Sequence, residues 1–515
     1  MTIMMARFPN ITNTVSDNNP AIKLFGRRFY KDQTPVEYLA EFLLVFASAK
    51  VVEGSYKYQF PLIVDKDKEL RYWPQVRLSL KFFSFFVFSK LETRYEVHSI
   101  EFCKGIEKLK SQINAGSDQK RDLTVRLLQS LFSGFVGVAK NRTWATQTFL
   151  PASDCLLAKE VDWRHTQAVA SNPPDWESTL KYFDTGAHNF MARGGELIYL
   201  QLLNLFSHGS SPAIEYLREL ESYKHLTDDA SWKQNIETKL REMLSKVENH
   251  IGGLASFIED CWKEYQYSSE PTSSTLGWVP SDTATEAYLL ASEMLNIVSS
   301  SHGSLQKVEF LQDLCCLHVL RTLCFRARRL GADTGETDGF IGNYAWIVCA
   351  RNSESAGEGR KLAIEGYLKI EQMLYRVLRI PHIASANLDP AKGDEHVFKL
   401  FRKLGKEIGL IVPRTGNHIR FVLPNSIIRL LVASLTKPGE RVRLSEFYRR
   451  IFAHYGIAIR STELAVALNW LGNPNSVVAV AQDTSWFEDE LQRGGFLIAL
   501  SDAVSIVWNP YTEKV

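Results

Sequence analysis

Residues 399–460 constrain the fold of this chain more than any other stretch. They contain thirteen Lys and Arg but only three acidic residues, Glu407, Glu440 and Glu446, although the net charge of all 515 residues is only +2. The same stretch alternates helix-like and strand-like patterns in the order helix, hairpin, helix. Because a concentrated basic surface on such a module is typical of nucleic-acid-binding proteins, the stretch predicts a winged-helix-like DNA binder.

The C-terminal third predicts two such modules in tandem, each with helices followed by a two-stranded wing. The acidic residues of 461–515, which outnumber Arg493 and Lys514 by seven to two, reverse the sign of the local charge. This acidic tail suits shielding of the basic stretch or binding of another basic subunit. The expected elements are helices over 395–408, 426–435, 444–454, 461–471 and 485–492, and strands over 410–413, 418–423, 496–500 and 505–508.

Part of the basic charge is expected on a single helix face. Lys399, Arg402, Lys403 and Lys406 follow the spacing i, i+3, i+4 and i+7, which places them in one stripe. Such a stripe suits DNA phosphates, with the wing reaching a groove. A docking surface for an acidic partner and a merely solvated face are the alternatives. The candidate nucleic-acid-binding residues are Lys399, Arg402, Lys403, Lys406, Arg414, His418, Arg420, Arg441, Arg443, Arg449 and Arg450.

The length of the chain predicts two to four domains. A polar, Asn-rich stretch predicts a flexible tail over 1–20. We expect a mixed α/β domain over 21–175, a helical domain over 176–385 with an internal linker at 267–283, and the tandem winged-helix-like modules over 394–515. The predicted fold class is therefore mainly α (α+β).

Two local patterns in the N-terminal region make specific predictions. Thr34-Pro35-Val36-Glu37 is a capping box with Pro at the first helical position, so a helix is expected over 36–49. Residues 58–66 and 76–88 alternate in the manner of strands. Longer helices are expected over 100–114, 122–135, 196–206, 212–223, 230–265, 283–298, 305–330 and 361–378.

The run Asp184–Glu196 is the best candidate for a special site outside the C-terminal third. It places His188, Arg193 and Glu196 around Gly194-Gly195, just before a predicted buried helix. Two glycines at a helix start leave backbone N–H groups for an anion or partner group, which Arg193 would also attract. The alternative is an ordinary tight turn, with Glu196 stabilising the helix N-terminus.

Two other clusters raise the question of a metal. Cys315, Cys316, His318 and Cys324 share one predicted helix, but structural zinc sites take paired ligands from a turn, so buried thiols are favoured and no metal is expected. Asp65 and Asp67, with Lys81, offer the acids and lysine that a magnesium-dependent nuclease needs, against the simpler interpretation of a solvated turn. No known catalytic or nucleotide-binding motif occurs, so no cofactor is expected.

The cysteines and the hydropathy indicate a cellular setting. Seven Cys, without any Cys-x-x-Cys pair, do not resemble a secreted disulfide framework, so a reducing cytoplasm is expected. The first residues lack the apolar run of a signal peptide. No stretch reaches the roughly 18 apolar residues of a membrane span, so no membrane partner is expected.

Three segments carry a resemblance: FGRRFYKDQTPVEYLAEFLLVF (25–46), SKLETR (89–94) and HNFMARGGELIYLQL (188–202). They resemble accessory proteins encoded in bacterial phage-defence or restriction gene clusters. The resemblance covers the N-terminal part of the chain and carries no catalytic residues.

Together with the basic stretch, the resemblance implies a non-catalytic DNA-binding or scaffold subunit of a bacterial multi-protein phage-defence or DNA-processing complex. Its partners would be double-stranded DNA and subunits such as an ATPase, helicase or nuclease. Two alternatives stay open: a divergent metal-dependent nuclease in the N-terminal region, and a protein–protein adaptor without nucleic-acid binding.

Overall fold

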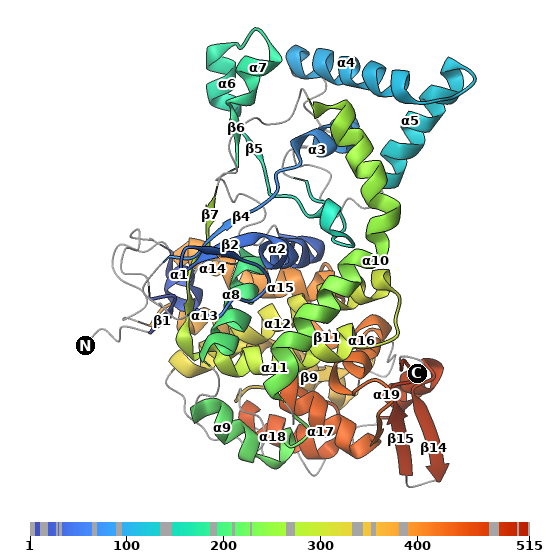
Figure 1. Ribbon diagram of the computed structural model, residues 1–515. Helices are drawn as coiled ribbons and strands as arrows, with labels where there is room; N and C mark the ends of the chain where they lie inside the picture. Colours follow the sequence, from blue (N-terminus) through green and yellow to red (C-terminus); the bar gives the residue numbers. More distant parts are fainter. Residues whose placement is uncertain are drawn as a thin grey trace.

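The computed structural model describes residues 6–10, 19–26, 29, 33–63, 69–88, 95–133, 147–185, 193–208, 212–226, 229–263, 273–331, 343–351, 357–380, 390–472, 484–501 and 504–512. Within these residues the chain is mainly helical and carries several small sheets (Figure 1), which confirms the predicted mainly α (α+β) class. None of the helices in this described part combines the length and apolar character that crossing a bilayer requires.

Described parts of the expected N-terminal tail are packed rather than loose. Strand β1 (Arg7–Phe8) pairs antiparallel with β8 (Val279–Pro280), and the Phe8 side chain is buried. Helix α1 (Pro20–Phe25) is capped by the side chain of Asn19 and buries most of its residues. The mostly polar composition of residues 1–20 did not indicate that Phe8 and Pro20 would be buried.

Helix α2 (Pro35–Ala47) confirms the capping box. The Glu37 carboxylate accepts the backbone N–H of Thr34 at 2.7 Å, and the helix begins at Pro35 as predicted. Its residues from Val36 to Phe46 are all buried, because α2 packs against α8 (Gly194–His208) and α12 (Ser304–Leu330). A helix apolar on most faces thus lies inside the molecule.

A four-stranded sheet follows α2, and this region corrects three predictions. Its order is β3 (Ser55–Lys57), β2 (Ala49–Val52), β4 (Arg71–Trp73) and β7 (Ser274–Thr275), with antiparallel pairing throughout. Strand β7 lies in the expected linker 267–283, so part of that linker belongs to this sheet. The strand expected over 76–88 is wrong: α3 (Leu78–Phe85) and a 3-10 turn (Phe86–Phe88) occupy it, since a segment buried on all sides has no diagnostic period. The strand expected over 58–66 is also not formed in its described residues, 58–63.

A second core occupies the upper end of the molecule in Figure 1. It collects Phe82, Phe83, Trp176 and Trp262, among other aromatic residues. The end of the long helix α10 (Trp232–Cys261) enters it from below. The other elements here are α4 (Glu96–Gln112), α5 (Asp118–Ser133), a 3-10 turn (Asp154–Leu156), β5 (Asp162–Trp163), α6 (His165–Ser171), α7 (Trp176–Leu180) and β6 (Phe183–Asp184).

The first core is larger and extends along most of the chain. Its buried residues run from Phe8 to Val507. Helices α8, α11 (Ala284–Val298) and α12 pack against one another at its centre. Around them lie α9 (Pro212–Glu219), 3-10 turns (Glu221–Tyr223, Asp229–Ser231 and Ser281–Thr283), α13 (Glu358–Val377), α14 (Pro390–His396), α15 (Phe398–Glu407) and α16 (Asn425–Leu435).

The first predicted wing forms, but inside a larger sheet. Strands β10 (Ile411–Val412) and β11 (Arg420–Val422) pair antiparallel as expected. Strand β11 also pairs in parallel with β9 (Trp346–Cys349), which in turn pairs with β13 (Ile457–Ala458). A strand from outside 394–515 thus joins the hairpin to the first core, so the hairpin is not the free wing of a separate module.

The second predicted hairpin also forms. Strands β14 (Leu497–Ser501) and β15 (Val504–Trp508) pair antiparallel, and β12 (Arg441–Arg443) pairs with the other edge of β15. Helices α17 (Leu444–Tyr455) and α19 (Ser485–Arg493) pack against this sheet, and α16 packs against both of these helices. Helix α18 (Ser461–Leu471) packs against β9, β13 and α13. The winged-helix assignment of this region stays a prediction.

Candidate nucleic-acid interface

Helix α15 divides its residues between the core and the surface. Leu400, Phe401 and Leu404 are buried against the first core. Lys399 is exposed, and Lys403 and Lys406 are partly exposed on the opposite side. The ammonium of Lys406 donates a hydrogen bond to the carbonyl oxygen of Arg414 at 2.9 Å. This contact fixes the helix stripe against the tip of the β10–β11 hairpin.

The hairpin tip adds further exposed polar groups. Arg414, Asn417 and His418 are exposed. The turn requires Gly416, whose φ of +98° lies in a region that other residues rarely adopt. We call the side chains of Lys399, Lys403, Lys406, Arg414 and His418 the basic surface.

Arg402 belongs to the predicted stripe, but its guanidinium is paired with side chains of another helix. Its Nε donates to the Glu371 carboxylate at 2.9 Å and to the Tyr367 hydroxyl at 3.2 Å. Both partners lie on α13, so Arg402 joins α15 to α13. Lys403 pairs with Glu407 at 3.6 Å across one turn of helix.

Arg450 is buried and Arg420 is partly buried, although both were predicted to contact DNA. Arg450 is 6% exposed and donates to the Glu440 carboxylate at 2.9 Å and to the Leu435 carbonyl oxygen at 3.0 Å. Arg420 is half-buried beside Cys349; burial raises the pKa of that thiol, and the Arg420 guanidinium opposes the rise. Arg450 therefore stabilises the fold rather than presenting a charge to DNA.

Arg441, Arg443 and Arg449 form a separate group on β12 and α17. Strand β12 belongs to a different sheet from the β10–β11 hairpin. The Arg441 guanidinium lies over the Trp508 ring at 5.4 Å, and Arg449 pairs with Glu446 at 2.5 Å. Of the eleven predicted contact residues, five thus belong to the basic surface and three to this separate group. The other three, Arg402, Arg420 and Arg450, belong to neither.

The helix that precedes the second hairpin is acidic. On α19, Glu488 and Glu490 are partly exposed and Asp489 is exposed. Glu490 pairs with Arg493 at 2.8 Å, which removes one of the few cations nearby. Because carboxylates repel phosphates, the surface of α19 is less suited to nucleic acid than the basic surface is.

The backbone N–H groups at the start of α8 already have an acceptor, and it comes from the chain itself. The Glu41 carboxylate accepts the backbone N–H of Gly195 at 2.6 Å and that of Arg193 at 3.1 Å. Glu41 is 2% exposed. Since the amides expected to receive an external anion are occupied by α2, this helix start has no vacant anion site. His188 lies outside the described residues.

A closed polar cluster surrounds Glu41. Glu196 accepts hydrogen bonds from the Tyr72 hydroxyl at 2.7 Å and from Arg193 at 3.1 Å. Burial, with a smaller contribution from Glu196, raises the pKa of Glu41 to about 8. Burial disfavours the charged form of Lys159 too, and so lowers its pKa; the Lys159 ammonium lies 3.5 Å from the Tyr72 hydroxyl. The cluster joins α2, α8 and the first sheet from within.

The cysteine-rich helix forms no metal site in the described part of the chain. Cys315, Cys316 and Cys324 are fully buried, and burial raises the pKa of Cys315 to about 12. His318 accepts from Arg321 through Nδ1 at 3.0 Å, so its Nε2 donates to Gln201 Oε1 at 2.7 Å. Both ring nitrogens of His318 thus have hydrogen-bond partners within the chain.

The sequence analysis missed a buried ionic chain beside this helix. Arg321 binds the Glu293 carboxylate through both terminal nitrogens, at 2.7 and 2.9 Å. His454 contacts the same carboxylate at 2.7 Å, and His225 contacts His454 at 2.9 Å. The sequence signal for this buried ionic chain was Arg321, a charged residue within the mainly apolar helix 311–325.

The nuclease alternative loses one of its three residues. Lys81 lies on helix α3, fully buried, and its ammonium donates to the Lys159 carbonyl oxygen at 2.6 Å. Burial lowers the pKa of Lys81 to about 7. Asp65 and Asp67 lie outside the described residues.

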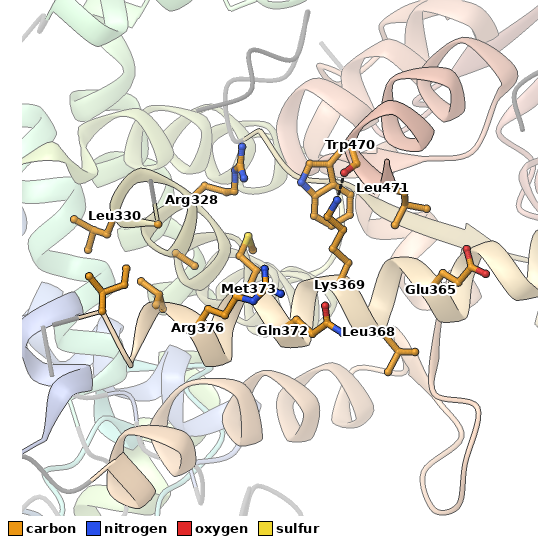
Figure 2. A pocket seen from close by; sticks show the side chains of 14 residues that line it. Arg328, Leu330, Glu365, Leu368, Lys369, Gln372, Met373, Arg376, Trp470 and Leu471 are labelled. Carbon is orange, nitrogen blue, oxygen red and sulfur yellow. Dashed lines mark hydrogen bonds between the residues drawn. The ribbon is translucent and has the colours of Figure 1, made fainter. Parts of the chain in front are cut away.

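A groove of about 860 Å³ lies between the end of α12, α13 and α18 (Figure 2). Leu330, Met373 and Leu471 contribute apolar wall, and Arg328 and Arg376 contribute charge. Lys369 extends toward Trp470, with its ammonium 4.8 Å from the ring centroid and bonded to the Trp470 carbonyl oxygen.

Comparison of the chain with protein-family models, with curated proteins and with solved structures found no match.

Proposed function

We propose that this chain is a non-catalytic, cytoplasmic subunit of a bacterial multi-protein phage-defence or DNA-processing complex, in which it binds duplex DNA. The basic surface contacts DNA phosphates, and an ATPase, helicase or nuclease in the complex is another polypeptide. The observation that carries the proposal is the Lys406–Arg414 hydrogen bond, because it holds the helix stripe and the hairpin tip in one exposed cationic surface. The resemblance of residues 25–46 to defence-cluster proteins supplies the biological setting.

Phosphate binding of this kind is electrostatic and weakly dependent on sequence. Each phosphate neutralised by a cation contributes about 0.9 to the slope of log Kobs against log salt concentration. The test replaces Lys399, Lys403 and Lys406 together by Ala and measures duplex binding by fluorescence anisotropy across salt concentrations. We expect weaker binding and a slope flatter by roughly 2 to 3.

A matched control removes the same charge from distant exposed positions. Lys104, Lys120 and Lys224 are exposed and lie outside the basic surface. Their combined replacement by Ala lowers the net charge equally, so it should leave the slope unchanged. An unchanged slope in the Lys399, Lys403 and Lys406 variant, or an equal change in the control, would remove the basic surface from DNA binding.

The non-catalytic part of the proposal has its own test. The purified chain should cleave neither ATP nor DNA. Magnesium-dependent DNA cleavage that is abolished by Asp65→Ala or Asp67→Ala would establish the nuclease alternative instead.

One observation favours the adaptor as a second candidate function. Leu123, Leu127 and Leu131 recur every four residues on α5 and are 58%, 61% and 41% exposed, and Lys120 and Arg126 flank them. This face suits an amphipathic helix of a partner subunit that has leucines opposite the stripe and acids opposite the cations.

The adaptor is tested with a designed peptide. A leucine-striped helical peptide with acidic flanks should bind the wild-type chain more tightly than it binds Leu127→Glu. The same peptide with basic flanks serves as the control. Equal binding of the acidic peptide to both chains would count against the adaptor.

A further inference from the structure

An aromatic cleft opens on the first sheet, away from the basic surface. It has a volume of about 410 Å³ and is lined by Tyr56, Tyr58 and Trp73. The rings of Tyr56 and Trp73 meet edge to face, with centroids 5.9 Å apart. Tyr56 is 65% exposed and Tyr58 is 52% exposed. Clustered aromatic exposure around a hollow differs from the scattered apolar residues of an ordinary surface and indicates a binding site.

The strand register explains how the hollow forms. Ala49 of β2 lies opposite Trp73 of β4, and Val51 lies opposite Tyr56 of β3. Because alternate residues of a strand face opposite sides, Tyr56 and Trp73 project from the same side of the sheet. Small residues, Ala47, Ser48 and Ala49, also line the cleft. Because the Tyr56 and Trp73 rings touch edge to face, a flat ligand lies against an exposed ring face beside them rather than between the two rings.

The polar groups of the cleft distinguish between flat ligands. Gln75 and Asp154 line one end of the cleft. Their amide and carboxyl groups match the hydrogen-bonding edge of a nucleobase, whereas a proline ring offers no such edge. Partial burial and the nearby Glu248 carboxyl raise the pKa of Asp154.

The charges on the cleft fit a base with its phosphate outside. Arg77 lines the cleft but is bound to the Glu259 carboxylate at 3.1 Å, so the interior is close to neutral. Arg71, two residues before Trp73 and on the same side of β4, is exposed, and its contact with Glu69 is loose at 3.6 Å. A cation at the rim and aromatic rings inside are the arrangement of single-strand binding surfaces.

From this geometry we infer that the cleft binds an unpaired nucleobase of single-stranded nucleic acid, stacked on the exposed ring of Tyr56 or Tyr58 beside Trp73, with Arg71 against the adjacent phosphate. This site is distinct from the proposed duplex contact, since the cleft and the basic surface lie on different sheets. Stacking tolerates any base, so binding is weakly selective for sequence.

The test uses a short fluorescein-labelled oligothymidylate in anisotropy titrations at elevated salt, where phosphate contacts are weakened but stacking persists. Tyr56→Ala with Tyr58→Ala should weaken binding roughly 5- to 150-fold for each stacked base lost. The Tyr56→Phe, Tyr58→Phe variant keeps both rings and should bind like the wild type. Thermal melts of each variant verify the fold, which the exposure of both tyrosines should preserve.

Tyr216→Ala is the matched control, because Tyr216 is 57% exposed on α9, outside the cleft. Affinity equal in the Tyr56, Tyr58 and Tyr216 alanine variants, or no saturable binding by the wild type, would overturn the inference. A proline-rich peptide that binds only when both tyrosines are present, while the oligonucleotide does not bind, would overturn it and assign the cleft to peptide. Loss of Lys399, Lys403 and Lys406 should leave oligonucleotide binding at elevated salt intact, so this inference and the duplex proposal fail separately.

Discussion

The carboxylate of Glu41 accepts the backbone N–H of Gly195 at 2.6 Å, across 154 residues of chain. Helix α2 thus supplies the carboxyl oxygen that accepts an otherwise unpaired N–H group at the N-terminus of α8. The contact needs the two helices to approach closely. A Cβ added to Gly195 would lie 2.4 Å from the backbone N of Phe42 and from the carbonyl oxygen of Tyr38.

This close approach predicts opposite effects for two glycine substitutions. Gly195→Ala should lower the free energy of unfolding by at least about 2 kcal/mol, because backbone atoms of α2 cannot move aside as a side chain can. Gly253 lies exposed within α10, and a Cβ there meets nothing within 4 Å. Gly253→Ala should therefore raise the free energy of unfolding by about 0.5–1 kcal/mol. Urea denaturation of both variants checks the pair; equal effects would contradict it.

The Arg321–Glu293 pair predicts a large cost for removing either partner. Both side chains are fully buried. Burial lowers the pKa of Arg321 and raises that of Glu293, but their mutual attraction outweighs burial, so the Arg321 pKa is raised and the Glu293 pKa is lowered. Arg321→Met should cost about 3–5 kcal/mol, because it leaves the Glu293 charge buried.

The double variant Arg321→Met, Glu293→Leu should recover part of that loss, since no isolated charge remains. An exposed pair gives the control: Asp118 is 92% exposed beside Arg121, and Arg121→Ala should cost under about 1 kcal/mol. Denaturant titration measures the free energy of unfolding of Arg321→Met, Glu293→Leu, the double variant and Arg121→Ala. A double variant as unstable as the sum of its single variants would contradict the argument.

His98 predicts part of the acid sensitivity of the fold. It lies among Phe82, Trp163 and Trp176, and burial lowers its pKa from 6.5 to about 3. Between these values the unfolded state binds a proton that the folded state does not. Stability therefore falls as the pH drops from about 6.5 toward 3, by up to about 1.4 kcal/mol per pH unit.

His98→Phe should keep the aromatic packing and remove this proton. The free energy of unfolding, measured by urea titration between about pH 6 and 4, should then fall less steeply by roughly 1 kcal/mol per pH unit. A slope equal to that of the wild type would show that His98 is not held neutral.

Arg450 and Lys399, both expected from the sequence to contact DNA, should behave differently. Arg450→Ala should lower the free energy of unfolding by about 2–3 kcal/mol, because Glu440 and the Leu435 carbonyl lose their donor. Lys399→Ala should change stability by less than about 0.5 kcal/mol and weaken duplex binding at low salt. Thermal melts and anisotropy separate the two; weaker duplex binding by folded Arg450→Ala without a loss of stability would contradict the assignment.

Local signals in the sequence predicted local structure well. The Thr34 capping box marks the start of α2 because its hydrogen bonds span only three residues. The Arg414–Asn417 turn predicts the β10–β11 hairpin for the same reason. Helix α3 was missed because its burial on all sides hides the helical period.

Contacts between distant residues could not be predicted. The spacing of Lys399 and Arg402 gives their helix face, but not that Glu371, 31 residues away, binds Arg402. The pairing of β9 with β11 joins segments that nothing local in the sequence connects. The aromatic cleft also escaped notice, since Tyr56 and Trp73 meet only when β2 lies between their strands.

Helix α10 gives the molecule a mechanical link between its two cores. Residues Trp232 to Leu244 are anchored in the first core and Ile251 to Trp262 in the second, on one rod about 45 Å long. Gly252 and Gly253 follow directly on the first anchor of the second core, and glycine is the weakest helix former after proline. Helix α10 is thus anchored in a separate core at each end, and its least helix-favouring residues lie just inside the second core. A bend of α10 between the two cores would meet the lowest helix propensity at these two adjacent residues.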